Sequence, residues 1–315
     1  MIFAVRLAVV TLSAFTAAGL VGLCLVPLLR RRASASTADA RARALFALRM
    51  MPAAASVGTS FVVALSFLFF ESRNALETPG RVLAALAVVG AVLIAGAIGR
   101  AALLGIRARR AYGAWLELAQ PVDPGFQSRI HAIVVESAFP IVAVFGVFRR
   151  RLVIARSVLD QCPPEELAAV LAHEESHIRR GDNLRRALMG LAPDLLTASR
   201  TGRRIADDWH TATEEAADDA AARLGADGRA TLAQALVRIA RMAPEGNALQ
   251  YLPTSALYRG ENIEGRVRRL LAPPVPPPPR RRVTKLGTVL GLALISLVVL
   301  GLVQQIIELA MIALP

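Results

Sequence analysis

Four long apolar runs constrain this chain more than any other feature. They cover residues 2–29, 51–70, 82–106 and 286–315. The hydrocarbon core of a bilayer is about 30 Å thick, and about 20 helical residues cross it. Each run is that long, whereas a helix of a soluble protein normally keeps a polar face. The sequence therefore predicts four transmembrane helices, three before and one after a polar segment. The first run is interpreted as a retained anchor, because it is long and its positive charges follow it.

Arginines gather beside these runs and predict the orientation of the chain. They occupy the segment 30–50, follow the third run and precede the fourth, and the net charge is +13. Positively charged loops stay in the cytoplasm. We therefore expect both termini outside, a basic cytoplasmic loop at 30–50 and a cytoplasmic domain between the third and fourth spans. Basicity that is confined to span ends indicates a lipid bilayer as partner and no direct nucleic-acid binding. Arg100, near the end of the third run, is expected to reach the headgroups.

The polar segment 111–272 is long enough for one domain and has mixed patterning. Short β-branched stretches at 130–136, 141–148 and 152–155 predict strands. Helical periodicity follows at 163–181, 205–224, 231–242 and 263–271. Residues 273–285 are rich in proline and arginine and predict an extended linker into the fourth span. The expected fold is an α-helical membrane protein with a cytoplasmic α+β domain.

The chemical signal is the motif His173-Glu174-Glu175-Ser176-His177. Residues four apart share one face of a helix, so both imidazoles can reach one tetrahedral zinc ion. Glu174, beside the first histidine, is then placed to act as general base on a water molecule. The chain has only four histidines, which makes a chance match at this spacing improbable. A surface helix that merely carries two histidines is the alternative.

A third zinc ligand is expected from the helix 205–224. Glu214 shares a face with Ala217 and Ala221, which is a buried stripe, whereas Glu215 lies on the wetter face with Asp219. A ligand must point inward, so Glu214 is the predicted third ligand. Asp218, one turn later, is expected to accept a hydrogen bond from a zinc-bound imidazole.

These motifs resemble those of the BlaR/MecR antirepressor family of membrane zinc peptidases. The similarity includes HEESH followed by Ile178–Asp182, Glu-x-x-Ala-Asp at 214–218, and Glu264-Gly265-Arg266-Val267 near the end. It implies a zincin-like peptidase domain with three spans before it and one after it, in a bacterial inner membrane. It also implies one zinc ion held by His173, His177 and Glu214, with Glu174 as general base. The family's extracellular penicillin sensor would follow the fourth span and has no counterpart in this sequence, so β-lactam sensing is not expected.

Several neighbouring residues keep two interpretations. Asp182 either caps a helix or forms an ion pair with Arg179 or Arg180, or it supports the zinc site. His210 is an alternative ligand and, with Tyr251 and Tyr258, a candidate for stabilising the oxyanion. The stretch 143–145 predicts a sheet edge that could pair with an extended substrate.

The expected function is a zinc-dependent membrane endopeptidase in transmembrane signalling. Its expected substrate is a cytoplasmic regulator, a transcriptional repressor in particular, or the protein itself. Two alternatives remain open. One is a quality-control protease for membrane proteins similar to the HtpX-type proteases, which share HExxH and ExxAD. The other is a metal-bound signal transducer with little proteolytic activity.

Overall fold

A computed structural model of the chain describes residues 2–30, 37–71, 78–120, 131–243 and 263–273. Three long helices form one end of the molecule: α1 (Ile2–Arg30), α2 (Ala38–Phe70) and α3 (Arg81–Glu117). All three are long and apolar enough to cross a membrane. The expected fourth span, and all of the expected linker except residue 273, lie outside the described residues.

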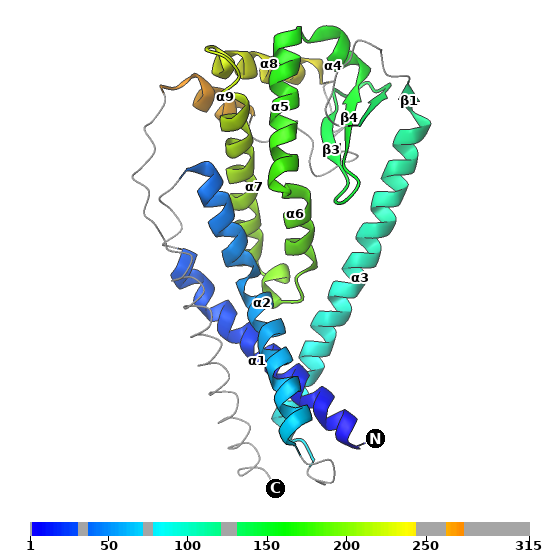
Figure 1. The fold of residues 1–315 in the computed structure, drawn as a ribbon, viewed down its shortest axis with the longest axis vertical. Helices are drawn as coiled ribbons and strands as arrows, with labels where there is room; N and C mark the ends of the chain where they lie inside the picture. Colours follow the sequence, from blue (N-terminus) through cyan, green and yellow to red (C-terminus); the bar gives the residue numbers. More distant parts are fainter. Residues whose placement is uncertain (1, 31–36, 72–77, 121–130, 244–262, 274–315) are drawn as a thin grey trace.

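The other end of the molecule contains a small sheet and the remaining helices (Figure 1). The strands are β1 (Ala119–Gln120), β2 (Ala132–Val135), β3 (Val142–Phe145) and β4 (Arg151–Ala155). The helices are α4 (Arg156–Gln161), α5 (Pro164–Arg180), α6 (Asp182–Leu191), the 3-10 turn η1 (Leu195–Ala198), α7 (Arg200–Ala221), α8 (Gly228–Met242) and α9 (Ile263–Leu271). Each of the predicted strands and helices of this domain overlaps an observed element, whereas β1, α4, α6 and η1 had no counterpart among the predictions.

Two of the long helices extend beyond their predicted spans. Most of the expected loop 30–50 is helical, because α2 begins at Ala38, where the Thr37 side chain accepts a hydrogen bond from the Ala40 amide. Its first turns bury Leu45 and Leu48 against helices of the other end of the molecule. The third helix continues past its apolar run to Glu117 and leads directly into β1. Helix α3 thus joins its membrane span to the domain as one continuous helix.

Small and hydroxylated residues bring the three long helices into close contact. Ser13 Oγ donates to the Leu83 carbonyl oxygen at 2.7 Å, and Thr16 Oγ1 donates to that of Leu86 at 2.8 Å. A Cβ atom on Gly90 would lie 2.8 Å from the Leu12 carbonyl oxygen, so only glycine permits this approach of α3 to α1. Packing of this kind is typical of helices in lipid, where small residues and interhelical hydrogen bonds replace the hydrophobic effect.

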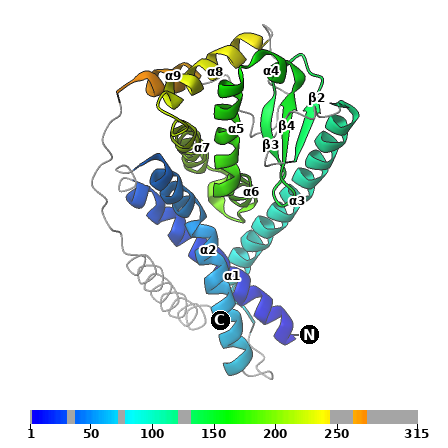
Figure 2. The ribbon, with the colours of Figure 1, turned by 45° about the horizontal axis from the view of Figure 1, so that its top comes forward.

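The sheet has the strand order β1-β2-β4-β3. Strand β2 is parallel to β4, whereas β1 and β3 run antiparallel to their neighbours. This order leaves β3 at an edge of the sheet. Helix α5 lies between this edge and α7 in two views (Figures 1 and 2), and α5 contacts both β3 and α7. The edge strand, α5 and α7 therefore surround the region where the predicted site residues lie.

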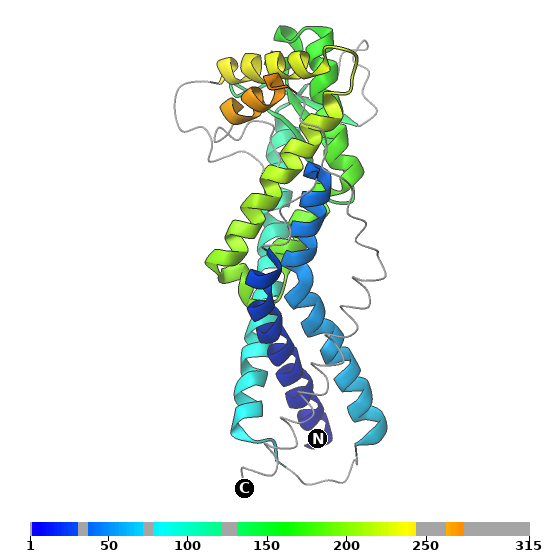
Figure 3. The same ribbon diagram turned by 90° about the vertical axis from the view of Figure 1, so that its left-hand side faces the viewer.

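Two hydrophobic cores hold the domain. The larger one joins the sheet to α5, α8 and α9. The smaller one joins α1 and α2 to α6, η1 and α7, with Trp209, Leu196 and Leu45 among its members. Figure 3 shows α7 extending alongside the upper part of α2. The domain is thus packed against the membrane helices and is not tethered to them by loops alone.

Candidate metal centre

Helix α5 presents the HExxH motif from a well-defined position. Pro164 is at its start, and Glu165 and Glu166 lie in the first turn, where they stabilise the helix dipole. The helix ends at Gly181, whose φ of 66° is left-handed. Glycine adopts this conformation without strain. The chain can therefore turn at Gly181 into α6, whose first residue, Asp182, lies beside His177.

The side chains of His173, His177 and Glu214 converge on one point. Their candidate ligand atoms all lie within 4.8 Å of one another. The two Nε2 atoms are 3.1 Å apart. Glu214 Oε2 lies 3.5 Å from His173 Nε2, and Glu214 Oε1 lies 3.5 Å from His177 Nε2. Ligand bonds of about 2.0–2.1 Å in a tetrahedral zinc site place neighbouring donors about 3.3 Å apart. The spacing and the chemistry of this donor set therefore fit zinc.

Glu214 reaches the histidines from α7, which packs against α5. It lies on the same face as Ala217 and Ala221, both fully buried. The neighbouring Glu215 points to the membrane helices, where it forms an ion pair with Arg41 of α2. The structure thus brings Glu214, and not Glu215, to the two histidines.

Two aspartates contact the histidines on their other ring nitrogen. Asp218 Oδ1 lies 3.0 Å from His173 Nδ1, and Asp182 Oδ2 lies 2.7 Å from His177 Nδ1. A carboxylate in this place keeps the proton on Nδ1 and leaves Nε2 free to bind a metal. Asp182 also accepts hydrogen bonds from Arg180, from its Nη2 at 2.7 Å. Both interpretations of Asp182, ion pair and support of the site, therefore describe real contacts.

Glu174 is buried beside the three donors, with 1% of its surface exposed. Its Oε2 accepts a hydrogen bond from the Val144 amide of the edge strand at 3.2 Å. Its Oε1 has no hydrogen-bond partner among the described residues. Burial raises the pKa of Glu174 to about 8, against the lowering effects of His173 and the Val144 amide. A buried carboxylate with one open oxygen fits a general base that receives a proton from a reacting molecule.

Arg266 completes the centre, a role that the motif Glu264-Gly265-Arg266-Val267 did not indicate. Its Nη1 lies 3.2 Å from Glu214 Oε2, and its Nη2 lies 2.6 Å from Asp218 Oδ1. One guanidinium thus holds both the candidate third ligand and the carboxylate behind His173. A sequence signal for it exists, because Arg266 shares one face of α9 with Ile263, Val267 and Leu270. An arginine on an apolar helix face needs a buried partner.

The charges of the centre shift its pKa values in opposite directions. Burial favours the neutral form of His173, but the carboxylates of Asp218 and Glu214 raise its pKa to about 9. Burial lowers the pKa of His177. Burial alone would raise the pKa of Glu214, yet His177, His173 and Arg266 hold it well below the usual value. Glu214 is therefore ionised and available as a ligand.

The other candidate residues lie at the edge of the centre or outside the described residues. His210 Nδ1 is 3.8 Å from Glu214 Oε1 and 3.2 Å from an Arg186 nitrogen, and His210 is not part of the converging group. Tyr251 and Tyr258 lie outside the described residues. The guanidinium of Arg100, which was expected to reach the headgroups, donates to the carbonyl oxygens of Gly190 and Ala192. These acceptors belong to the domain, which the sequence pattern could not place beside α3.

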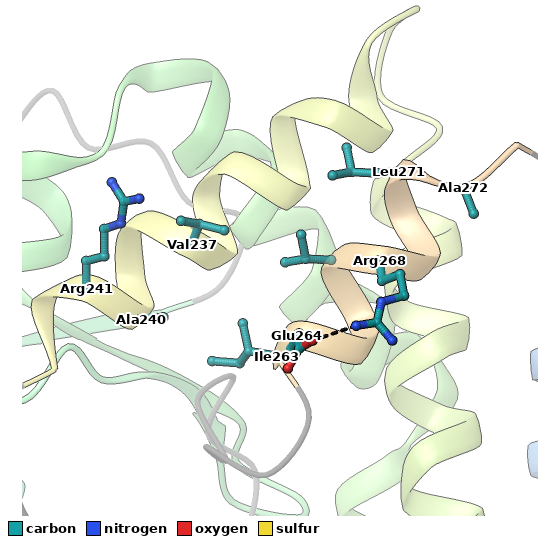
Figure 4. A pocket seen from close by; sticks show the side chains of 9 residues that line it. Val237, Ala240, Arg241, Ile263, Glu264, Arg268, Leu271 and Ala272 are labelled. Carbon is teal, nitrogen blue, oxygen red and sulfur yellow. Dashed lines mark hydrogen bonds and ion pairs between the residues drawn. The ribbon is translucent and has the colours of Figure 1, made fainter.

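The described part of the chain also contains an open groove between α8 and α9 (Figure 4). Val237, Ala240 and Ile263 give it an apolar lining, and Glu264 and Arg268 pair beside it at 2.6 Å. None of the residues of the metal centre lines it. Helix α9 therefore has two roles, since Arg266 turns inward to the centre and Arg268 outward.

The fold and the centre together define a membrane metallopeptidase, and comparison with known families gives the same class. The family model described as BlaR1 peptidase M56 matches residues 24–196, and Peptidase family M48 matches residues 114–286. Each match covers more than half of the chain. The chain belongs to the BlaR1 peptidase M56 family, the BlaR/MecR type of membrane metallopeptidase, and its peptidase domain also belongs with Peptidase family M48. No curated protein matches the chain significantly.

The two matches include different parts of the centre. The BlaR1 peptidase M56 match contains α2, α3 and both histidines but ends before α7. The Peptidase family M48 match contains the histidines together with Glu214 and Arg266. The complete converging group thus falls inside one family match.

Proposed function

We propose that the protein is a zinc-dependent endopeptidase of the membrane that cleaves a cytoplasmic regulator or itself in transmembrane signalling. The convergence of His173, His177 and Glu214 beside the buried Glu174 carries this proposal. One zinc ion per chain would be held by the two Nε2 atoms and the Glu214 carboxylate. A transcriptional repressor is the proposed regulator, and the arginine-rich ends of the spans support a cytoplasmic domain.

The residues of the centre have distinct roles in peptide hydrolysis. When bound, zinc supplies a Lewis acid that activates water and polarises the peptide carbonyl. Glu174 accepts a proton from the attacking water and delivers it to the leaving amine nitrogen. Asp218 and Asp182 keep the two imidazoles oriented. Arg266 fixes Glu214 and Asp218 relative to each other.

The edge strand β3 is the proposed place for the substrate backbone. An extended peptide can add to an open sheet edge through main-chain hydrogen bonds. At Val144 the amide donates to Glu174, and the carbonyl oxygen accepts from Asn183 Nδ2 at 2.9 Å. A substrate that pairs at this residue must exchange with these two side chains, so substrate binding and release of Glu174 are coupled.

The experiment compares wild-type protein, Glu174→Gln and Glu175→Gln in membranes. Glu175 is the next residue of α5 and is not part of the converging group, so its variant is the matched control. Cleavage of the protein itself and of co-expressed repressors is followed, and bound zinc is measured. We expect Glu174→Gln to keep zinc and lose cleavage, with Glu175→Gln active. Equal cleavage by Glu174→Gln and wild type would refute the catalytic role.

A second candidate function is quality control of membrane proteins, in the manner of HtpX-type proteases. The observation that favours it is the match of residues 114–286 to a family other than BlaR1 peptidase M56. The two functions differ in substrate range. Cleavage of many misfolded membrane proteins, with candidate repressors left intact, would favour quality control. Zinc binding without cleavage of any of them would favour a metal-bound transducer.

A further inference from the structure

Helix α3 is exposed on every side over residues 101–110. The first six of these residues are apolar, and Leu103, Leu104 and Ile106 are 56%, 45% and 48% exposed. A helix that is apolar on all sides belongs in a protein core or in lipid. The exposed surface is continuous with the membrane span of the same helix, and Arg107, the first of three arginines, follows it. Lipid acyl chains therefore extend along α3 to about Ile106.

Arg100 places the end of α6 beside this apolar part of α3. Its Nε donates to the Gly190 carbonyl oxygen and its Nη2 to that of Ala192, both at 3.1 Å. Arg100 precedes Ile106 by six residues, which is about 9 Å along a helix. The end of α6 thus lies at a level where lipid acyl chains still surround α3.

The segment at this level, residues 187–198, is called the α6 tip here. Leu188 is 42% exposed, and Leu191 and Leu195 are half-buried. The acidic residue of the tip, Asp194, is buried and paired with Arg49 of α2 at 2.8 Å. A polar group that faces hydrocarbon needs a partner inside the protein. The charge of the tip is therefore paired inside the protein, while Leu188 faces outward and Leu191 and Leu195 are partly exposed.

Exposed arginines follow the tip directly. Arg200, Arg203 and Arg204 occupy the first turns of α7 and are all exposed. Leucines flanked by arginines are the pattern of segments that lie in the membrane interface, where the leucines enter the acyl boundary and the arginines meet anionic headgroups. The positive charge of the arginines and the apolar leucines of the tip thus both fit a bilayer that contains anionic lipid.

We propose that the α6 tip is inserted into the interface of the bilayer leaflet that faces the peptidase domain, with anionic phospholipid against Arg200, Arg203 and Arg204. The domain is then held to the membrane by lipid contact of its own, in addition to the packing against α1–α3. Helix α6 has ten residues and begins at Asp182, which contacts His177. The candidate metal centre is therefore within one helix length, about 15 Å, of lipid.

Depth-dependent quenching tests this proposal. Single cysteines replace Leu188 in the tip, Val92 in the span of α3 and Leu224 beyond the far end of α7, all exposed leucine or valine positions. The background variant is Cys24→Ala, and Cys162 stays because it is buried and burial raises the pKa of its thiol to about 11. The full chain carries an environment-sensitive fluorophore in vesicles of phosphatidylcholine and phosphatidylglycerol, with or without doxyl-labelled acyl chains.

Doxyl lipid should quench the labels at Leu188 and Val92 roughly twofold or more and leave the label at Leu224 almost unchanged. The proposal is wrong if the Leu188 label is quenched no more than the Leu224 label. A blue-shifted but unquenched Leu188 label would also overturn it, because protein would then cover the tip, from the segment 286–315 or from a second copy. The readout needs neither zinc nor catalysis, so its failure would leave the proposed peptidase function standing.

Discussion

Replacing Arg266 with alanine should destabilise the metal-free protein much more than replacing Arg268, two residues later on the same helix. Arg266 pairs with Asp218 at 2.6 Å, and the side chains are 8% and 0% exposed. Arg268 pairs with Glu264 at the same distance, but those side chains are 77% and 85% exposed. Each variant thus removes a guanidinium from an ion pair of 2.6 Å, and the two pairs differ because one is buried and the other is exposed.

The expected magnitudes follow from this difference in burial. Removing one partner of a buried ion pair costs about 3–5 kcal/mol, because the other charge stays buried and unpaired. An exposed pair contributes about 0–1 kcal/mol. Arg269 lies 3.3 Å from Asp218 and offsets part of the loss, so the lower end of the range, about 3 kcal/mol, is expected for Arg266→Ala. A domain of this size loses about 2–4 °C in Tm per kcal/mol, which predicts a fall of about 6–12 °C.

Thermal unfolding of the detergent-solubilised proteins measures the effect, with EDTA and with added zinc. Zinc should reduce the fall for Arg266→Ala, because the metal would balance the charge of Glu214. Adding Asp218→Asn to Arg266→Ala should restore part of the lost stability, since no unpaired carboxylate remains at position 218. Equal Tm shifts for Arg266→Ala and Arg268→Ala in EDTA would refute the reasoning. If Arg266→Ala does not accumulate, Arg266→Lys with the same controls provides the comparison.

Three further predictions concern the metal centre and the free thiol. Glu214→Ala should lose stoichiometric zinc and Glu215→Ala should retain it, as measured by metal analysis of the purified variants; the reverse result would show that the wrong glutamate was chosen. Asp182→Asn should weaken zinc binding by about 10- to 100-fold in a competition titration, because the His177 imidazole loses its orienting carboxylate; an unchanged affinity would limit Asp182 to its ion pair with arginine. Cys162 should react with iodoacetamide at pH 9 about 50-fold more slowly in the folded than in the unfolded chain, because burial raises its pKa to about 11 and leaves little thiolate; equal rates would contradict its burial.

The local elements could be predicted because their signals are short-range. The 3.6-residue period, Pro164 at the start and Gly181 at the end define α5 from the sequence alone. The spacing of His173 and His177 predicted the shared helix face, and the apolar stripe of α7 separated Glu214 from Glu215. These inferences need only the geometry of one helix.

The lengths of the long helices α1, α2 and α3 could be predicted less well. Hydropathy indicates where a helix can meet lipid, but it does not indicate where the helix ends. Helix α2 begins earlier than its apolar run because Leu45 and Leu48 pack against the domain, and α3 continues as far as Glu117. Arg100 illustrates the same point, since its partners are main-chain carbonyl oxygens almost a hundred residues away.

By itself, the sequence determined that this chain has membrane-spanning helices before a domain with an HExxH helix and a glutamate-bearing helix, because periodicity, caps and motif spacing are local properties. Only the tertiary structure decided how these helices meet. It brings Arg266 of α9 onto Glu214 and Asp218, aligns Asp182 with His177, and sets the domain on α2 and α3 through Arg49 and Arg100. Such contacts join residues far apart in the chain, so their charges and shapes are complementary only after folding.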